Sequence, residues 1–238
     1  HKFLWGNRFR SDYSTPITAN IVYLDTLMGG LSPVRKGGGT QSKALQLKAS
    51  DGKKYVIRAM KKQGAQYIQS SMFENQYVEN QFRDTASENL IEDVFTGSYP
   101  FAPFIIPTLS QSIGLAGLNS KLYYIPKQKA LGNYNKEFGD ELYLFEEHAS
   151  DGHKELALDN FSGKILSTMD MMNEMHNDES KSVDEKEYIK GRLFDMLIGD
   201  WDRHQDQWRW LEYKENGKTI YRPLPRDRDQ SFSRMSDG

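Results

Sequence analysis

Residues 199–210 read Gly-Asp-Trp-Asp-Arg-His-Gln-Asp-Gln-Trp-Arg-Trp, so acidic, basic and aromatic residues lie close together directly after a predicted helix. The alternating run that contains Trp208 and Trp210 leads to Asn216-Gly217, a strong signal for a two-residue β-hairpin turn. A second run returns from that turn and ends in Pro-Arg-Asp-Arg-Asp-Gln-Ser-Phe at residues 225–232. We therefore predict one antiparallel hairpin, with Trp208 and Trp210 in the core.

The Asn-Gly turn also predicts the register of this hairpin. With a two-residue loop, Glu215 pairs with Lys218, and the numbers of each facing pair sum to 433. Pro223 and Pro225 have no backbone N–H, so we expect the pairing to loosen near the end that they occupy.

This register gathers oxygen-bearing side chains at the far end of the hairpin. Asp206 is predicted to face Asp227, and Gln207 lies next to Asp206. Asp229 follows two residues after Asp227, and Asp202 belongs to the loop beside them. Clustered carboxylates repel one another unless a cation lies among them, and oxygen ligands suit Mg²⁺ or Mn²⁺. We expect a metal site here; the alternative is that both Asp-Arg tripeptides are solvated surface ion pairs.

Composition restricts the class of protein. The 238 residues carry 31 Lys+Arg against 33 Asp+Glu, a net charge of −2, which gives no overall basic field for nucleic-acid binding. An aromatic content of 12% argues against disorder. The chain has no cysteine, which excludes disulfides, thiolate zinc sites and a cysteine nucleophile.

No stretch of the sequence is suited to span a membrane. The longest uncharged stretch, about residues 97–119, contains Pro100, Pro103 and Pro107 and is interpreted as a helix end and a loop. The chain begins at a histidine without an initiator methionine, so we expect a processed protein or a piece of a longer one.

The first half is predicted to be rich in strands. Residues 31–36, 43–49 and 53–60 are predicted strands; Gly37-Gly38-Gly39 separates the first two, and Asp51-Gly52 marks a tight turn between the last two. Further strands are predicted at residues 121–126 and 141–147.

Helices are predicted between and after these strands. From residue 73 to Gly97 the sequence has a helical pattern. Apolar residues at helical spacing after Ser87 predict a helix that begins near Ser87 and ends at Gly97. In the second half, one predicted helix places together the side chains of Ile165, Met169, Met172 and His176. Another, over residues 184–198, is predicted to bury the side chains of Ile189, Leu193, Met196 and Leu197. A polar stretch at residues 147–152 is the predicted boundary between a mostly β part and a mostly α part.

Taken in order, these motifs resemble a protein-kinase-like fold of the DRHxxN type, as in HipA-type kinases, CotH spore-coat kinases, phosphatidylinositol kinases and secretory-pathway casein kinases. The resemblance is most specific at Asp202-Arg203-His204, moderate at residues 229–232, and weakest at the glycine loop. It implies an α+β, two-lobed fold: a β-rich nucleotide-binding N-lobe over residues 1–147, and a mostly helical, truncated C-lobe over residues 148–238 with the catalytic loop and the metal-binding hairpin. ATP would lie between the lobes.

The resemblance assigns roles in the second half. Asp202 matches the catalytic aspartate that receives or orients the proton of the acceptor hydroxyl, and His204 braces the loop through hydrogen bonds. Asp229 matches a metal-binding aspartate. The relatives hold a further metal ligand five residues after the catalytic aspartate, where this chain has Gln207 with Asp206 beside it, so either residue is a candidate.

Asp227 resembles the additional acid of an Asp-x-Asp form found in some relatives. The implied cofactors are ATP and Mg²⁺ or Mn²⁺.

In the first half, Gly37, Gly38 and Gly39 resemble a phosphate-binding loop, since glycine lets backbone N–H groups approach phosphates closely. Val56 and Arg58 lie on one face of their strand, so Val56 would cover an adenine while Arg58 reaches the phosphates. The relatives have lysine where this chain has Arg58. Lys36 and Lys61 are alternative phosphate-binding groups.

Two more residues are assigned by the resemblance. Asp93, or its neighbour Glu92, would pair with Arg58 as the helix acid of the family does. Glu146 lies at the end of the strand where the hinge backbone would contact adenine.

Residues 34–39 and 194–204 also resemble the internal region of large bacterial envelope proteins that combine a metallophosphoesterase with an outer-membrane surface-antigen barrel. This resemblance implies a location in the bacterial cell envelope, in the periplasm or associated with the outer membrane, and flanking domains as partners. The kinase resemblance implies further helices after Asp229, which only nine residues follow here.

We therefore expect a metal- and ATP-dependent phosphotransferase whose acceptor no motif indicates. The alternative is a catalytically inactive kinase-like binding or scaffold module, motivated by Arg58 in place of lysine. A metal-dependent hydrolase ranks third, because none of the HExxH, GxSxG or histidine-rich motifs accompanies the acids.

Overall fold

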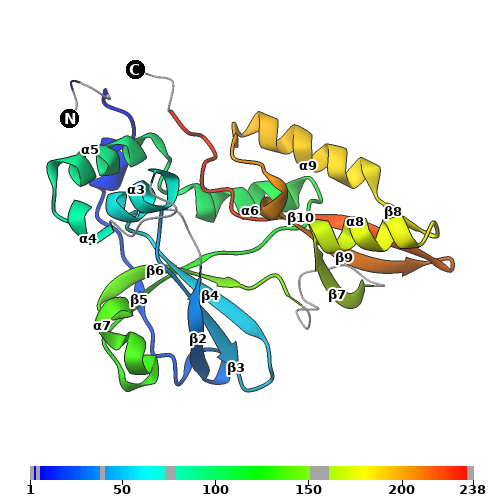
Figure 1. Ribbon diagram of the computed structural model, residues 1–238, viewed down its shortest axis with the longest axis horizontal. Coiled ribbons are helices and arrows are strands. Elements are labelled where there is room, and N and C mark those ends of the chain that lie inside the picture. Colours follow the sequence, from blue (N-terminus) through cyan, green and yellow to red (C-terminus); the bar gives the residue numbers. More distant parts are fainter. Residues whose placement is uncertain (1–2, 4–5, 38–40, 73–78, 151–160, 235–238) are drawn as a thin grey trace. The chain divides into compact units, whose positions relative to one another are not determined.

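The computed structural model of the chain describes residues 3, 6–37, 41–72, 79–150 and 161–234 (Figure 1). The chain divides into two units. The first comprises His1–Ser98, Lys121–Glu146 and Arg234–Gly238, and the second comprises Tyr99–Ser120 and Glu147–Ser233. Residues 99–120, which the predicted boundary at residue 147 assigned to the first lobe, thus belong to the second unit. Each unit has its own sheet and helices, which confirms the α+β class.

The first unit is built on a six-stranded sheet with the order β1-β5-β6-β4-β3-β2. Its strands are β1 (Asn20–Ile21), β2 (Leu31–Gly37), β3 (Ala44–Ala49), β4 (Lys54–Ala59), β5 (Lys121–Ile125) and β6 (Glu141–Glu147). Strands β2, β3 and β4 form an antiparallel meander, β5 and β6 pair antiparallel, and β1 is parallel to β5. The strands predicted from alternation and turn signals are therefore confirmed to within a residue or two at each end.

Short helices complete this unit. They are α2 (Arg10–Tyr13), α3 (Gly64–Met72), α4 (Glu79–Phe82), α5 (Ala86–Val94) and α7 (Asn135–Phe138), with 3₁₀ turns η1 (Leu27–Gly29), η2 (Phe95–Gly97) and η3 (Lys129–Tyr134). Helix α5 begins at Ala86, one residue before Ser87, because the Thr85 side chain caps it by accepting a hydrogen bond from the Glu88 N–H at 3.2 Å.

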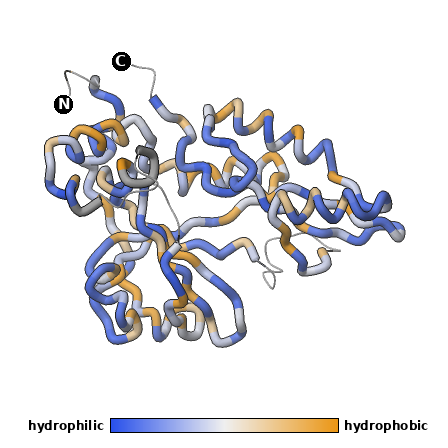
Figure 2. The backbone as a smooth tube through the Cα atoms, in the orientation of Figure 1, coloured by the Kyte–Doolittle hydropathy of each residue, from blue (hydrophilic) through white to orange (hydrophobic). Residues whose placement is uncertain are grey.

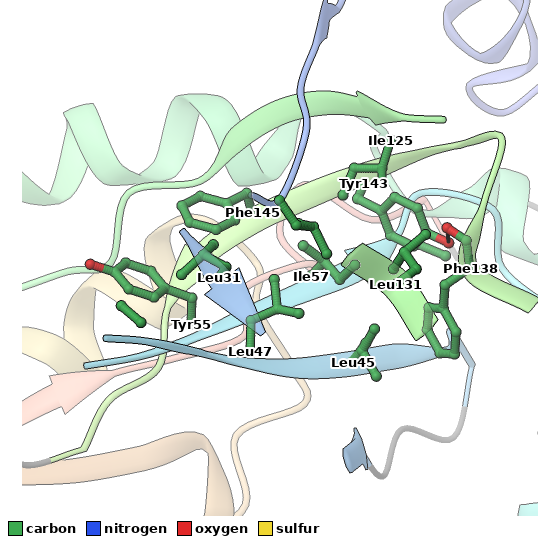
Figure 3. Close-up of a cluster of buried hydrophobic side chains, with 13 residues drawn as sticks. Leu31, Leu45, Leu47, Tyr55, Ile57, Ile125, Leu131, Phe138, Tyr143 and Phe145 are labelled. Atoms are coloured by element: carbon green, nitrogen blue, oxygen red, sulfur yellow. Dashed lines mark hydrogen bonds between the residues drawn. The ribbon is translucent and has the colours of Figure 1, made fainter. Parts of the chain in front are cut away.

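One face of the sheet carries the core of the first unit (Figure 3). Leu45, Leu47 and Ile57 from the meander are fully buried there, and Leu131 and Phe138 from η3 and α7 pack against the same cluster. On β4 the residues alternate between this core and the opposite face, as expected of a strand with one buried face.

The second unit has a four-stranded sheet with the order β7-β9-β10-β8. Its elements are α6 (Ala102–Ser112), β7 (Phe161–Ser167), α8 (Thr168–Asn177), β8 (Lys181–Val183), α9 (Glu185–Leu197), η5 (Gln205–Gln207), β9 (Trp208–Glu215) and β10 (Lys218–Pro225). This unit therefore combines a sheet with helices, whereas the resemblance implied a mostly helical lobe.

Helix α6 corrects the interpretation of residues 97–119 as a helix end and a loop. Pro103 lies in the first turn of α6, where a missing N–H costs nothing, and only Pro107 lies inside the helix. Ala102 and Ile106 pack against Phe194 and Ile198 in a buried cluster, which offsets the backbone hydrogen bond lost at Pro107.

The predicted helix through Ile165 is also wrong in part. Ile165 lies in strand β7, and α8 begins only at Thr168, capped by the Ser167 side chain. Met169 and Met172 are exposed, and it is Met171 that enters the core.

Helix α9 buries a different face from the predicted one. Ile189, Leu193, Met196 and Leu197 are 56%, 60%, 74% and 81% exposed, whereas Gly191, Phe194 and Asp195 are buried. A Cβ at Gly191 would lie 3.3 Å from the Trp208 ring, and Asp195 forms ion pairs, so the buried face is selected by close approach and charge. A hydrophobicity pattern does not count either residue as a core residue.

Within the described residues, no helix is both long and apolar enough to cross a membrane.

Candidate functional site

The β9–β10 hairpin has the predicted register. Glu215 faces Lys218, and the pairs continue without a shift to Trp208 and Pro225. The turn residues Asn216 and Gly217 have φ values of 51° and 76°, the left-handed conformation that a two-residue hairpin turn requires. Trp208 and Trp210 are each 4% exposed, as predicted.

Pairing continues through both prolines and does not loosen at Pro223, which faces Trp210. Beyond Pro225, the Arg226 N–H still donates to the Gln207 carbonyl at 2.9 Å. Because residues 205–207 turn into η5, the strand register ends at Trp208 and Pro225, two positions short of the expected facing pair Asp206 and Asp227.

A single buried carboxylate on α9 binds the arginines of both Asp-Arg tripeptides. Arg203 Nε donates to Asp195 Oδ2 at 3.2 Å, and Arg228 Nε donates to Asp195 Oδ1 at 3.0 Å. The Asp195 side chain is 1% exposed, and the side chains of Arg203 and Arg228 are 2% and 6% exposed. Both arginines therefore point into the second unit and are not solvated surface charges.

Each arginine makes further contacts that fix the backbone around it. Arg203 donates to the carbonyl of Arg226 at 2.6 Å and to that of Gln207 at 3.1 Å, which links the loop at residues 199–207 to the end of β10. Its guanidinium also lies over the Trp208 ring, 4.7 Å from the centroid. Arg228 donates to Ser110 Oγ on α6 at 3.0 Å.

Sequence reasoning missed Asp200, which lies in the same cluster. Its side chain is fully buried, with its Oδ2 3.4 Å from Arg203 Nη1. Neither of its carboxylate oxygens accepts a hydrogen bond within the part of the chain that the structure describes. Burial raises the pKa of Asp200 to about 7, with Asp195 and Asp229 raising it further and Arg203 and Arg228 opposing them.

A buried acid with a strongly shifted pKa, next to half-exposed acids, is typical of a functional site. The signal in the sequence is the spacing of acids at 195, 200 and 202 around the helix end, of which the predicted metal-binding cluster contains only Asp202.

Asp202, His204 and Asp206, which follow Asp200 in the chain, are more exposed. His204 lies among three predicted site residues: its Nε2 is 4.0 Å from Asp202 Oδ1 and 3.2 Å from Gln207 Nε2, and its Nδ1 is 3.9 Å from Asp206 Oδ2. The His204 Nδ1 also accepts a hydrogen bond from the Asp206 N–H at 3.3 Å, so His204 caps η5. The expected bracing of this loop by His204 is consistent with these contacts.

The predicted metal ligands fall into different environments. The Asp206 side chain is 75% exposed, whereas Gln207 is buried with its amide against His204. Asp227 has a left-handed backbone with φ of 52°, and Asp229 accepts a hydrogen bond from Gln230 Nε2 at 3.2 Å. Among the described residues, no group of three or more His, Asp or Glu side chains is arranged to hold a metal ion.

In the first unit, the sheet places the predicted phosphate-binding residues in one row. Gly37 pairs with Ala44 and Ala44 pairs with Arg58, so Gly37 and Arg58 lie on the same face, two strands or about 10 Å apart. Val56 and Arg58 are half-buried on the face opposite the core, as predicted. Gly38 and Gly39 lie outside the described residues.

Strand β6 is the neighbour of β4, with the Met60 N–H donating to the Leu142 carbonyl at 3.1 Å. Glu146 lies near the end of β6, and β6 is the strand next to β4, which carries Arg58. Of the alternative cations, Lys36 forms an ion pair with Glu137.

Asp93 has a partner that the sequence did not indicate. Arg10 binds both of its carboxylate oxygens, with Nη2 to Oδ2 at 2.7 Å. These hydrogen bonds lower the pKa of Asp93 to about 2. Asp93, the acid expected to pair with Arg58, thus pairs with Arg10 in the segment before β1. Glu92 remains the alternative partner of Arg58.

Comparisons with protein-family models, with curated proteins and with solved structures find no match for this chain. Its function is therefore inferred from the site itself.

Proposed function

We propose that this chain is a metal- and ATP-dependent phosphotransferase domain. The observation that carries the proposal is the attachment of Arg203 and Arg228 to the one carboxylate of Asp195. This attachment fixes the backbone on either side of both arginines while Asp202 and Asp229 stay half-exposed. Preorganised acids on a rigid frame are what phosphoryl transfer needs, because its catalysis rests on positioning and charge neutralisation.

The first unit supports the proposal through the row Gly37–Ala44–Arg58. A glycine at the end of β2 and a cation about 10 Å away on the same face suit a chain of phosphates. Arg58 would bind phosphate oxygens through its planar fork, which is always charged. Val56, two residues earlier on the same face, would contact the base.

In the second unit, Asp202 would accept a hydrogen bond from the acceptor hydroxyl and orient it. His204, 4.0 Å from Asp202 and capping η5, would hold that side chain in place.

The acids of this unit fit an ion that takes one or two carboxylates and completes its shell with water and phosphate. Asp229 is half-exposed, and its charge reaches Asp200, whose oxygens accept no hydrogen bond from the described residues. Bound Mg²⁺ or Mn²⁺ would neutralise charge on the phosphate. Asp206 and Gln207 remain alternative ligands of the metal ion, and Asp227 remains an additional acid.

Two readouts test this proposal. Thermal unfolding is measured with ATP and either Mg²⁺ or Mn²⁺ for the wild type, for Asp229→Asn and for Glu179→Gln, an exposed acid of the same unit as control. A ligand at about 100 times its Kd stabilises by roughly 2.7 kcal/mol, a rise of a few degrees in Tm. We expect a metal-dependent rise that Asp229→Asn abolishes and Glu179→Gln retains.

Turnover is then followed as metal-dependent release or transfer of the γ-phosphate of ATP. Asp202→Asn is expected to keep the nucleotide-induced rise in Tm and to lose turnover by about 10²-fold or more. Equal turnover in Asp202→Asn and the wild type would refute the assignment of Asp202.

A second candidate is a kinase-like binding module without catalysis. The engagement of Asp93 by Arg10 favours it, because the acid that would orient Arg58 is already paired. It predicts a rise in Tm with nucleotide but no phosphate release in any variant, or no rise at all.

A further inference from the structure

Helix α8 presents two methionines and a histidine to solvent on one face. Met169 and Met172 are 52% and 55% exposed, and His176 is exposed as well. Spacings of three and four residues place these side chains within about 60° of one another around the helix axis. The hydropathy colouring of the backbone shows hydrophobic residues interspersed with hydrophilic ones along α8, so this face is no continuous apolar patch (Figure 2).

The other two methionines of α8 hold the helix in place. Met171 is 4% exposed and Met175 is partly buried, and both belong to the hydrophobic cluster that contains the two buried tryptophans. Met169 and Met172 belong to none of the buried clusters in the part of the chain that the structure describes. Packing therefore accounts for one pair of methionines and leaves the donor atoms of the other pair accessible.

The donor atoms on the outer face of α8 are soft. The chain has no cysteine, so the thioether sulfur of methionine is its softest metal-binding group. Thioether ligands select Cu(I), and imidazole nitrogen also suits copper. Mg²⁺ takes oxygen ligands instead, so this set of side chains suits a different ion from the acids around the β9–β10 hairpin.

We propose that Met169, Met172 and His176 bind one Cu(I) ion on the outer face of α8. Side chains three or four residues apart on a helix have Cβ atoms about 5–6 Å from one another, and Met172 lies between the other two along the axis. The three rotatable bonds of methionine let each sulfur turn toward a common point beside the imidazole.

The surroundings of His176 fit a bound cation. Its ring forms no hydrogen bond or ion pair with any residue that the structure describes, so a ring nitrogen is accessible to a metal ion. His176 also lies in the last turn of α8, where the helix dipole favours positive charge.

This inference does not depend on phosphotransfer and is tested first with Ag(I), a soft ion that is stable in air. Methyl ¹³C NMR of the methionine-labelled chain follows its nine methionines separately. We expect the signals of Met169 and Met172 to shift together and to saturate at one equivalent of Ag(I). Met196 is 74% exposed but has no histidine three or four residues away, so its signal should stay in place. Mg²⁺ should shift none of the three.

Competition for Cu(I) with bathocuproine disulfonate under anaerobic conditions then measures the affinity. Losing an outer-shell partner of a metal ligand already costs about 10–100-fold, so Met172→Leu and His176→Gln should each weaken binding by at least about 10-fold. Met196→Leu, the same substitution at a more exposed methionine, is the matched control and should leave the affinity unchanged. All three side chains are exposed, so these variants should fold as the wild type does.

Three outcomes would overturn the proposal. They are a wild type that binds neither ion, equal Ag(I) shifts at Met172 and Met196, and an unchanged Cu(I) affinity in both Met172→Leu and His176→Gln.

Discussion

Asp195 and Arg228 lie together inside the second unit: Arg228 Nε donates to Asp195 Oδ1 at 3.0 Å, and Arg228 Nη2 is 2.8 Å from the same oxygen. The other oxygen of Asp195 accepts from Arg203. One helix residue thus holds two loops that are 25 positions apart in the sequence, each with acids beside its arginine. The arginines of the two tripeptides are buried and bind Asp195, whereas the acids next to them stay half-exposed.

Asp195→Asn should therefore be strongly destabilising although it changes one atom. It removes the charge that compensates two buried guanidinium groups, and breaking a buried pair from one side costs about 3–5 kcal/mol. Urea unfolding followed by tryptophan fluorescence measures this loss, since Arg203 lies over the Trp208 ring. Arg192→Gln is the matched control. The Arg192 side chain is 39% exposed, and its Nη1 lies 3.5 Å from Asp195 Oδ2, farther than the nitrogens of Arg203 and Arg228, so its loss should lower the free energy of unfolding by under about 1 kcal/mol. Equal, small losses in both variants would contradict the role of Asp195.

Asp200 should make stability fall as the pH rises. Its pKa is 3.8 when unfolded and about 7 in the folded chain, so between these values the folded state binds the proton that the unfolded state has lost. The free energy of unfolding should decrease from about pH 4 to pH 7 by a few kcal/mol and level off above pH 8.

Asp200→Asn should remove this slope, because an amide carries no proton to lose, and should be more stable than the wild type at pH 8. Denaturant unfolding of both proteins at several pH values between about 5 and 8 measures the difference. Parallel curves for the two would show that Asp200 does not titrate in this range.

The hairpin could be predicted from the sequence because its register depends on local chemistry. Asn216 and Gly217 adopt the left-handed backbone that the turn needs, and every pair from Glu215 to Trp208 follows from that turn. The alternation at Val56 and Arg58 is equally local. These features need no knowledge of the rest of the chain.

The buried face of α9 could not be predicted in the same way. Gly191 is buried because the Trp208 ring approaches it, and Asp195 is buried because two arginines from distant loops bind it. Both causes are tertiary, and neither residue is apolar enough to mark a core position. Asp200 could not be predicted for the same reason, since only burial distinguishes it from the more exposed acids around it. Asp93 was assigned to Arg58 by the resemblance, and nothing local indicated Arg10, which is 83 residues away.

Arg10→Gln should release Asp93 and weaken the attachment of the segment before β1. The Arg10 hydrogen bonds hold the pKa of Asp93 at about 2, below its unfolded value of 3.8, so the pair stabilises the fold above about pH 4 and is lost as the pH falls toward 2. We expect a loss of about 1–2 kcal/mol at pH 7 and a rise in the pKa of Asp93 toward its ordinary value. Carboxyl ¹³C NMR titration measures the pKa, with Arg35→Gln as control, because Arg35 Nε donates to the Gln46 amide oxygen at 2.9 Å. An unchanged Asp93 titration in Arg10→Gln would contradict the pairing.

Gly64→Ala should destabilise the first unit although alanine is the better helix former. Gly64 begins α3 where it contacts α5, and a Cβ there would lie 2.7 Å from the Glu88 backbone oxygen. Helix propensity favours alanine by about 1 kcal/mol, but backbone oxygen cannot move aside as a flexible side chain can, and overpacking of this kind costs about 1–3 kcal/mol. Because Glu88 also accepts a hydrogen bond from the Ala65 N–H at 3.2 Å, moving α5 away would break that contact as well. Thermal unfolding of Gly64→Ala is measured beside Gly117→Ala, a glycine outside the helices where the added Cβ meets Ser110 Cβ at an ordinary 3.7 Å, as a control for the change of glycine to alanine itself. A higher Tm for Gly64→Ala than for the wild type would mean that propensity outweighs the close approach of the two helices.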